Sequence, residues 1–209
     1  MNELRRSRLR VGVDVPWVTS WSAEAVLGAR PCATVAGRIA VHQLERPGYG
    51  RPNYSRNHLR RQRQSIARML CPMCGRPTAA EDRWLQTGRR LAVGALRARG
   101  LGALLPSDLS DDRVVVDAGA IAPSHLACAR RAAAHCPHLQ SHTSGELMAF
   151  PEAWSVAPLL VRLAPPGPGR PSRRPAAAVA AISFLQLCGL TAERDPAWAD
   201  RPGAALSRA

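Results

Sequence analysis

The sequence predicts a small α+β fold with short strands and two or three helices, and its size, composition and cysteine content support this class. The 209 residues fit one domain with extensions or two very small domains. A hydrophobic content of 46% argues against wholesale disorder, but only 4% of the residues are aromatic, so the apolar core should be small. Six cysteines are too few for a disulfide scaffold and enough for one metal site, which would strengthen such a core.

The chain is strongly basic, with a formal net charge of +14. Such a charge favours a nucleic-acid partner, because clustered cations release counterions when they bind phosphate. All 29 basic residues are arginine, however, which codon usage in a GC-rich genome also produces without selection for a partner. The local signal is stronger, since residues 46–80 contain no acidic residue and eight arginines: Arg46, Arg51, Arg56, Arg60, Arg61, Arg63, Arg68 and Arg76.

The amino-terminal part predicts two strands and a loop. Residues 11–17 and 36–44 mix apolar and β-branched positions and predict the strands. Residues 45–54 are dense in proline, glycine and asparagine and predict the loop, in which Tyr49 and Tyr54 stand among arginines. These tyrosines either stack on nucleic-acid bases or pack the loop against the protein.

Residues 57–70 predict a helix that Asn57 can cap. At about 100° per residue, one face of this helix collects four apolar residues, which are Leu59, Ile66, Met69 and Leu70. Another face collects Arg60, Arg61 and Arg68. The apolar face should be buried, and the arginine face is either a phosphate-binding surface or simply solvated.

Further along, residues 87–100 have helical composition and residues 113–117 form a short apolar strand between acidic turns. Ser124 opens a second helix that covers residues 123–136. A linker rich in proline, glycine and arginine follows. The chain then divides into residues 1–55, strand-rich with the basic loop; 56–145, the metal module; 146–164, a short extension; 165–175, the linker; and 176–209, a tail with one apolar helix.

Two pairs of ligands at suitable spacing predict the metal site. Cys71 and Cys74 form a C-x2-C knuckle, and Gly75 lets the backbone curl so that both thiolates reach one ion at about 2.3 Å. His125 and Cys128 lie three residues apart in the first turn of a helix, which places them on the same face. Together they would form a tetrahedral Cys3His zinc site, and a site with four protein ligands is usually structural. The alternative for Cys71 and Cys74 is a redox C-x2-C motif. The alternative for His125 and Cys128 is an ordinary buried histidine and cysteine.

A knuckle followed by strands and then by a helix that supplies two ligands resembles the treble-clef group of zinc fingers, over residues 70–139. The resemblance implies that residues 87–100 are an insertion in the hairpin, because 50 residues separate Cys74 from His125. The broader pattern is also similar to uncharacterised zinc-finger proteins of GC-rich actinobacteria and their phages: Arg-Gln-Arg before Cys-Pro-Met-Cys-Gly, then His-Leu-Ala-Cys-Ala and Cys-Pro-His-Leu. That similarity implies no biochemical activity.

A second group of candidate ligands consists of Cys136, His138 and His142, with His135. Cys136 lies eight residues beyond Cys128, about 12 Å along a straight helix, so it cannot reach the same ion. We expect one zinc ion, with Cys136 a small buried residue at the helix end and the histidines solvated.

The remaining cysteines, Cys32 and Cys188, have no partner at ligand spacing and are expected to be core thiols. Residues 11–17 are too short and broken for the apolar part of a signal peptide. Residues 176–190 fall short of the roughly 20 apolar residues that a membrane span needs. We therefore expect a cytoplasmic protein without a membrane partner, whose thiolates favour metal over disulfides.

No catalytic motif is complete, so the sequence indicates no reaction. An HNH-type nuclease needs a histidine on the hairpin as general base, and none occurs between Gly75 and Ser124. A zinc deaminase needs His-x-Glu, whereas His42 and Glu45 are one residue too far apart. A phosphate-binding loop with its lysine is absent from a chain that has no lysine.

The leading expectation is a zinc-stabilised protein that binds DNA or RNA through an arginine-rich helix and loop beside the knuckle. The expected contacts are Arg51, Arg56, Arg60, Arg61, Arg63, Arg68, Tyr49 and Tyr54. The alternative is a zinc-stabilised module for protein interaction or assembly, without catalytic activity.

Overall fold

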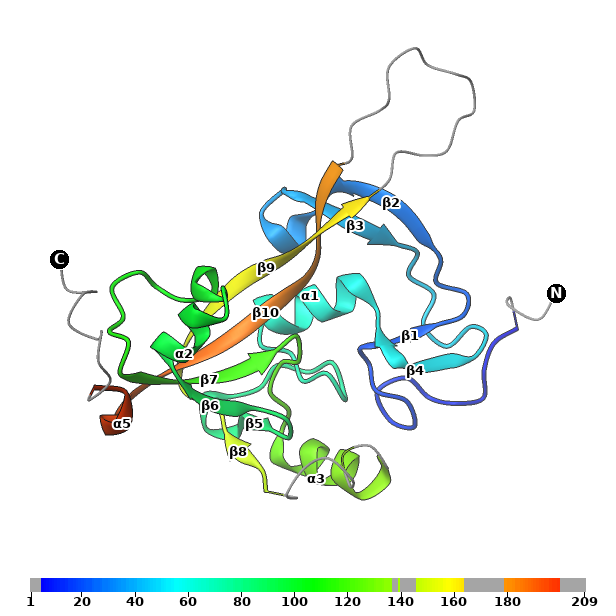
Figure 1. Ribbon diagram of the computed structural model, residues 1–209. Helices are drawn as coiled ribbons and strands as arrows, with labels where there is room; N and C mark the ends of the chain where they lie inside the picture. The colour runs from blue at the N-terminus through cyan, green and yellow to red at the C-terminus, as the bar shows by residue number, and fades with distance from the viewer. Residues whose placement is uncertain (1–4, 137–138, 140–145, 164–178, 200–209) are drawn as a thin grey trace, which may run out of the picture. The chain divides into compact units, whose positions relative to one another are not determined.

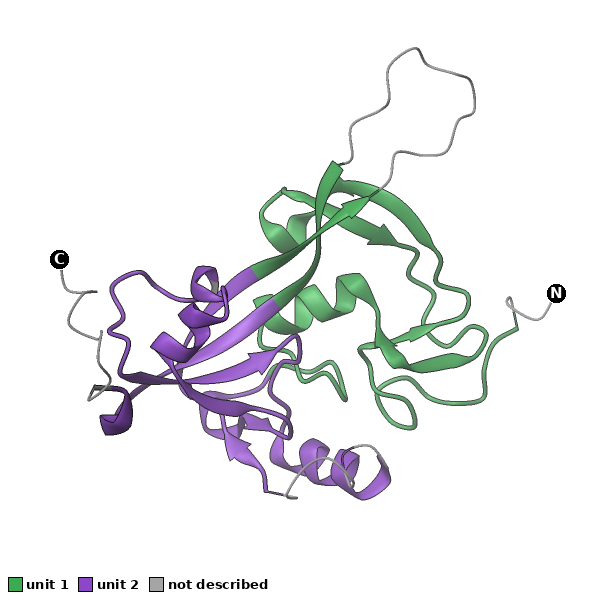
Figure 2. Cartoon of the chain, in the orientation of Figure 1, with its two compact units in different colours: residues 1–77, 158–185 green, residues 78–157, 186–209 purple. Residues whose placement is uncertain are grey.

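The computed structural model describes residues 5–136, 139, 146–163 and 179–199. The linker expected at residues 165–175 lies outside these ranges. Contacts divide the chain into two compact units, Met1–Pro77 with Pro158–Leu185 and Thr78–Ala157 with Gln186–Ala209 (Figure 2). The expected boundaries do not coincide with these units, because a unit boundary falls between residues 77 and 78, inside the segment 56–145.

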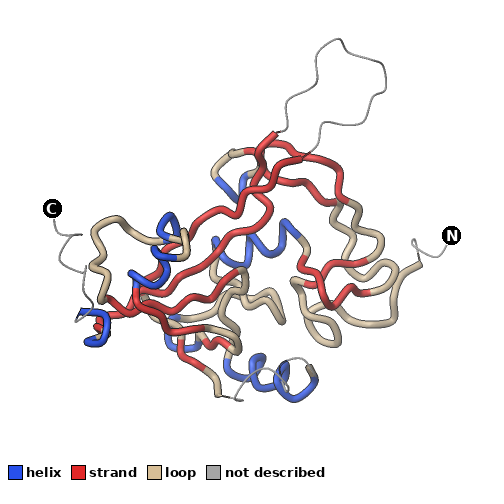
Figure 3. The backbone as a smooth tube through the Cα atoms, in the orientation of Figure 1, coloured by secondary structure: helices blue, strands red, loops and turns tan. Residues whose placement is uncertain are grey.

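The fold is α+β, as the sequence predicts, with more of the described residues in strands than in helices (Figures 1 and 3). The strands are β1 Thr19–Trp21, β2 Val26–Pro31, β3 Ile39–Gln43, β4 Pro52–Asn57, β5 Trp84–Leu85, β6 Arg89–Ala92, β7 Arg113–Gly119, β8 Met148–Ala149, β9 Ala153–Leu163 and β10 Val179–Arg194. The helices are α1 Leu59–Ala67, α2 Val93–Ala98, α3 Leu126–His135 and α5 Pro196–Ala199, with 3-10 turns η1 Ala33–Val35, η2 Ala80–Asp82 and η3 Gly102–Leu104.

The first unit contains part of a sheet, a small ribbon and helix α1. Strand β2 pairs antiparallel with β3, and β3 pairs in parallel with the first half of β10 through Ala40 and Ile182. Strands β1 and β4 form a separate antiparallel ribbon. Helix α1 contacts η1 and β3, and Ile66 on its buried face is 1% exposed. The helix expected over residues 57–70 is therefore confirmed, although His58 and not Asn57 is its N-cap, where the His58 side chain accepts from the Arg61 amide.

In the second unit, the last half of β10 pairs antiparallel with β7, and β7 pairs antiparallel with β6. Helix α2 follows β6 directly and lies within the β6 to β7 connection. Val93 and Leu96 of α2 form a buried core with Val115 of β7 and Cys188 of β10. The predicted strand at 113–117 and the predicted helix at 123–136 are confirmed as β7 and α3.

Three expected elements are wrong. Residues 87–100 are not one helix, because Arg89–Ala92 form strand β6 and helix α2 covers only Val93–Ala98. Residues 11–17 are not a strand but a turn, in which Gly12 has φ +79 and the Asp14 carboxylate accepts from the Arg10 amide at 2.8 Å. The expected apolar helix in the tail, at residues 176–190, is instead strand β10, whose described part begins at Val179. Its alanines favour a helix locally, but pairing with strands far away in the sequence decides its conformation. Among the described residues, no helix is long and apolar enough to cross a membrane.

Candidate metal centre and nucleic-acid interface

The knuckle at Cys71 is a tight loop closed by its own backbone. The Cys71 amide donates to the Arg76 carbonyl at 2.8 Å, and the Gly75 amide donates back to the Cys71 carbonyl at 2.8 Å. Leu70 and Pro77 form a bridge at the base of the loop. Gly75 has φ +76, a conformation that a residue with a Cβ adopts only at a cost. The glycine is therefore what allows Cys71 and Cys74 to face the same point.

The segment before β1 supports the knuckle through backbone hydrogen bonds that no local sequence pattern predicts. The amides of Trp17 and Val18 donate to the carbonyls of Met73 and Pro72, at 2.9 and 3.0 Å. A Cβ on Gly75 would lie 2.8 Å from the Trp17 ring, so the indole packs directly against the glycine. Trp17 thus holds the knuckle without being a ligand.

The other ligand pair begins α3. His125, and not the expected Ser124, is the N-cap residue, and Cys128 lies in the first turn. The side chains of His125 and Cys128 contribute to one cluster of possible ligands, as expected from their spacing. Asp82 accepts from the Leu126 amide at 2.7 Å, which satisfies one of the free donors at the helix start. Trp84 and Ser124 exchange two backbone hydrogen bonds of 2.9 Å and fix the chain just before His125.

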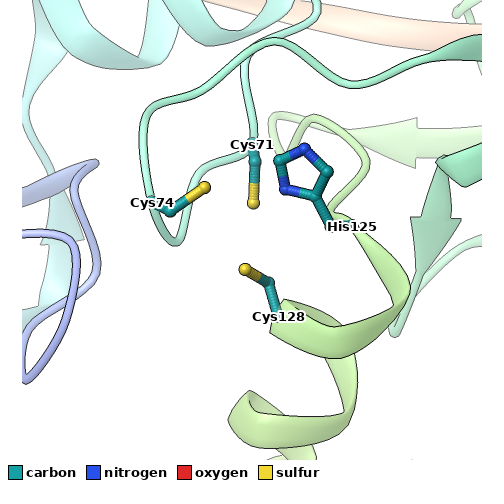
Figure 4. Close-up of side chains that lie close together, drawn as sticks. All are labelled: Cys71, Cys74, His125 and Cys128. Atoms are coloured by element: carbon teal, nitrogen blue, oxygen red, sulfur yellow. The ribbon is translucent and has the colours of Figure 1, made fainter.

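These four residues form a cluster in which the ligand atoms all lie within 4.8 Å of one another. In Figure 4 the sulfur atoms of Cys71, Cys74 and Cys128 and the ring of His125 face a common centre. Cys71 is buried and the other three are partly exposed.

The donor set fits zinc. Three thiolates and one imidazole are the ligands of a Cys3His site, and sulfurs about 2.3 Å from a tetrahedral ion are about 3.8 Å apart. A largest separation of 4.8 Å therefore needs a contraction of about 1 Å, within the reach of side-chain rotation. All six cysteines are free thiols, so no disulfide competes for these sulfurs. With four protein ligands the site has no open position for a reacting water.

The other cysteines have different environments. Cys188 is buried, as expected, and burial raises the pKa of its thiol to about 12. Cys136 follows α3 and is partly exposed, so the expectation that it is buried is wrong. His138 and His142, the other proposed members of its cluster, lie outside the described residues. Cys32 is partly exposed and lines a pocket, so it is not the core thiol that the sequence predicts.

The expected nucleic-acid contacts divide into two groups. Six of them are exposed: Arg51, Arg56, Arg60, Arg68, Tyr49 and Tyr54. The exposed fraction is 64% for Tyr54 and 38% for Tyr49. Arg61 and Arg63 are each only 1% exposed, so the expectation that they contact phosphate is wrong. The sequence does not predict this burial, because arginine is usually a surface residue.

Arg61 is held by a buried carboxylate. Its terminal nitrogens donate to the two Glu24 oxygens at 2.7 and 2.8 Å, and one of them also donates to the Thr19 carbonyl at 2.8 Å. His58 lies beside this pair, with Nε2 3.9 Å from Glu24. Burial, together with the charge of Arg61, lowers the pKa of His58, so the ring is neutral at neutral pH.

Arg63 joins two strands where their pairing is sparse. β3 and β10 share one register pair, Ala40 with Ile182. The Arg63 guanidinium donates to the Val41 carbonyl on β3 at 3.0 Å and to the Ser183 carbonyl on β10 at 2.7 Å. It thereby supplies hydrogen-bond donors to these two carbonyls where the pairing between β3 and β10 is sparse.

A basic hollow extends the exposed part of the interface. The amino-terminal segment pairs with the loop before β4, since the Ser7 amide donates to the Gly48 carbonyl and the Gly50 amide to the Arg5 carbonyl. The resulting hollow has a volume of about 550 Å³, and its lining includes Arg5, Arg6, Arg8 and Arg51. The sequence shows the first three only as a terminal cluster, because their pairing with the loop is a long-range contact.

Comparison with protein-family models, with curated proteins and with solved structures finds no match to this chain.

Proposed function

We propose that the chain is a zinc-stabilised protein that binds DNA or RNA through the basic surface of its first unit. The ion would be held by Cys71, Cys74, His125 and Cys128, and would act structurally by closing the chain between Cys74 and His125. In chain order the knuckle is followed by the β6–β7 hairpin and then by α3, the order of a treble clef, with α2 and η3 inserted in the hairpin. The free thiols suit the reducing cytoplasm.

The observation that carries the proposal is the unequal distribution of charge between the two units. The described part of the first unit has fifteen arginines and three acidic residues, whereas that of the second has nine arginines and ten acidic residues. Codon usage in a GC-rich genome would raise the arginine content of both units alike and would not remove acidic residues from one of them. The imbalance therefore supports selection for an anionic partner at the first unit.

The three carboxylates described in this unit are each paired with an arginine, so none of them is left to neutralise the other arginines. Glu24 is buried against Arg61, Asp14 pairs with Arg10, and Glu45 pairs with Arg60. The remaining exposed arginines are available for phosphate, above all Arg5, Arg6, Arg8, Arg51, Arg56 and Arg68. Such a surface fits binding to the phosphate backbone and not sequence readout.

Tyr54 adds a position for base stacking. It is 64% exposed on β4, two residues before the exposed Arg56, and alternate residues of a strand share a face. An exposed aromatic ring beside a cation is the arrangement that proteins use to bind single strands. Tyr49, at 38% exposure beside the basic hollow, is the second candidate.

Salt dependence of binding tests the proposal. Fluorescence anisotropy with a labelled single strand and a labelled duplex would be measured from 50 to 200 mM salt. About seven phosphate contacts should make log K fall with log salt at a slope near −6 for duplex, a loss of roughly 10³- to 10⁴-fold over this range. Undetectable binding at 50 mM salt to both DNA and RNA would refute the proposal.

Matched charge reversals separate a local interface from general attraction. The double variant Arg51→Glu with Arg56→Glu should reduce affinity by at least tenfold at 100 mM salt. It should also make the slope of log K against log salt shallower by about 2, because two phosphate contacts are lost. Arg89→Glu with Arg99→Glu is the control, because both arginines are exposed in the second unit and the change in net charge is the same. Equal losses in the two double variants would show that only net charge matters.

The alternative, a protein-interaction module, is favoured by a different observation. Strand β2 is at the edge of its sheet, and Val26 and Leu27 on it are each 57% exposed. Exposed apolar residues on an edge strand are a common site of pairing with another chain. Light scattering at 300 mM salt tests this function, since a complex formed through β2 should persist at high salt and be lost in Val26→Asp with Leu27→Asp.

A further inference from the structure

A small pocket in the first unit is lined by an unusual set of polar side chains. It has a volume of about 180 Å³ and lies among β2, η1, β3 and α1. Its polar lining consists of Arg30, Cys32, Thr34, His42, Arg60 and Arg63. No carboxylate lines it, although three guanidinium groups do. The volume is below the roughly 300 Å³ at which pockets for drug-sized ligands begin, so it suits a small ligand.

The buried charge of Arg63 is the second observation. Within the described residues, its hydrogen bonds go to backbone carbonyls, to the Thr34 hydroxyl at 3.2 Å and to the Cys32 sulfur at 3.9 Å. No described carboxylate forms a salt bridge with it. A buried cation without a countercharge is costly, and its burial lowers the pKa of Arg63. The site therefore favours an anion.

Two other lining groups are affected by the same positive field. Partial burial, reinforced by the charges of Arg30, Arg60 and Arg63, lowers the pKa of His42. Burial alone would raise the pKa of the Cys32 thiol, but hydrogen bonds with Thr34 and the charge of Arg63 outweigh burial and lower it. Both groups thus respond to a positive potential in the pocket.

We propose that this pocket binds a single oxyanion of the phosphate class, either free phosphate or a terminal phosphate monoester. Arg30 is exposed at the pocket and supplies donors, and Arg60 can turn to the ligand from its exposed pair with Glu45. Arg63 contributes its positive charge to the pocket but no hydrogen bond to the ligand, since its donors already bond to the protein, for example to the Ser183 and Val41 carbonyls. This inference goes beyond the proposed function and does not require the basic hollow to bind nucleic acid.

Equilibrium dialysis with radiolabelled inorganic phosphate, at constant ionic strength set with sodium chloride, tests the proposal on the full zinc-loaded chain. We expect saturable binding of one phosphate per chain. Arg30→Gln should weaken it at least tenfold. Arg38→Gln is the matched control and should bind like the parent, because Arg38 is exposed in the same unit and does not line this pocket.

A second readout locates the ligand. Phosphate should slow the alkylation of Cys32 by iodoacetamide, followed by peptide mass spectrometry, and leave the alkylation of Cys136 unchanged. To identify the source, a 5′-phosphorylated oligonucleotide and its 5′-hydroxyl counterpart would compete with the labelled phosphate. Stronger competition by the phosphorylated form assigns a terminal monoester, and equal competition assigns free phosphate. No saturable binding, or equal binding by the parent and Arg30→Gln, would overturn the proposal.

Discussion

Two neighbouring arginines of α1 should differ sharply in their contribution to stability. Arg61 is 1% exposed and forms a two-pronged pair with Glu24, which is fully buried at the side chain, whereas Arg60 and Glu45 are 46% and 34% exposed. We expect Arg61→Met to destabilise the protein far more than Arg60→Met, although both changes remove one charge from consecutive positions of the same helix.

The magnitude follows from burial. Arg61→Met removes three hydrogen bonds of 2.7 to 2.8 Å and leaves the Glu24 carboxylate buried with only backbone donors, from Trp21 and Arg46. Breaking a buried ion pair by removing one partner costs about 3 to 5 kcal/mol. An exposed pair such as that of Arg60 contributes about 0.2 to 1 kcal/mol. The two variants should therefore differ by at least about 2 kcal/mol in the free energy of unfolding, a large part of the 5 to 15 kcal/mol typical of a domain.

Urea unfolding followed by circular dichroism, at pH 7.5 with zinc present, measures both variants. Glu24→Gln in the Arg61→Met background completes a cycle, and it should cost less there than in the parent, because the carboxylate has already lost its partner. A difference below about 1 kcal/mol between Arg61→Met and Arg60→Met would refute the assignment of a buried pair that stabilises the helix.

Three further results are expected. Gly75→Ala should weaken zinc binding in competition with a chromophoric chelator, because φ is +76 and the new Cβ would meet the Trp17 ring; unchanged affinity would contradict the packing of the knuckle. Tyr54→Ala should reduce single-strand affinity by about 1 to 3 kcal/mol and leave the salt slope unchanged, which anisotropy can show. The pKa of His58 is lowered, so the unfolded chain binds more protons below about pH 6.5, and the contribution of His58 to stability is complete above that pH and falls as the pH drops. An NMR titration of the His58 ring with a midpoint at 6.5 or above would refute this.

The ligand set of the metal site could be predicted from local sequence, because a knuckle and the first turn of a helix each fix two ligands within four residues. The pairing of these halves across 50 residues followed from chemistry, since three thiolates and one imidazole form one site. The supporting residues could not be predicted, because Trp17 and Asp82 reach the two halves through contacts that leave no spacing pattern.

The predictions from local sequence are wrong where long-range contacts override local conformational preference. Residues 176–190 read as a helix because of their alanines, yet β10 pairs with both β3 and β7. Arg61 and Arg63 read as surface residues, yet one neutralises Glu24 and the other joins two strands. A polar side chain that satisfies buried backbone groups has no signature in hydrophobic periodicity.

The most direct test of the central claim is the zinc content per chain, measured by elemental mass spectrometry on untagged protein. The parent and Cys136→Ser should each contain one zinc, and Cys74→Ser should lose it, because Cys74 belongs to the cluster and Cys136 does not. Folded parent protein without zinc, or equal zinc content in Cys74→Ser and the parent, would contradict the assignment of Cys71, Cys74, His125 and Cys128 as the site.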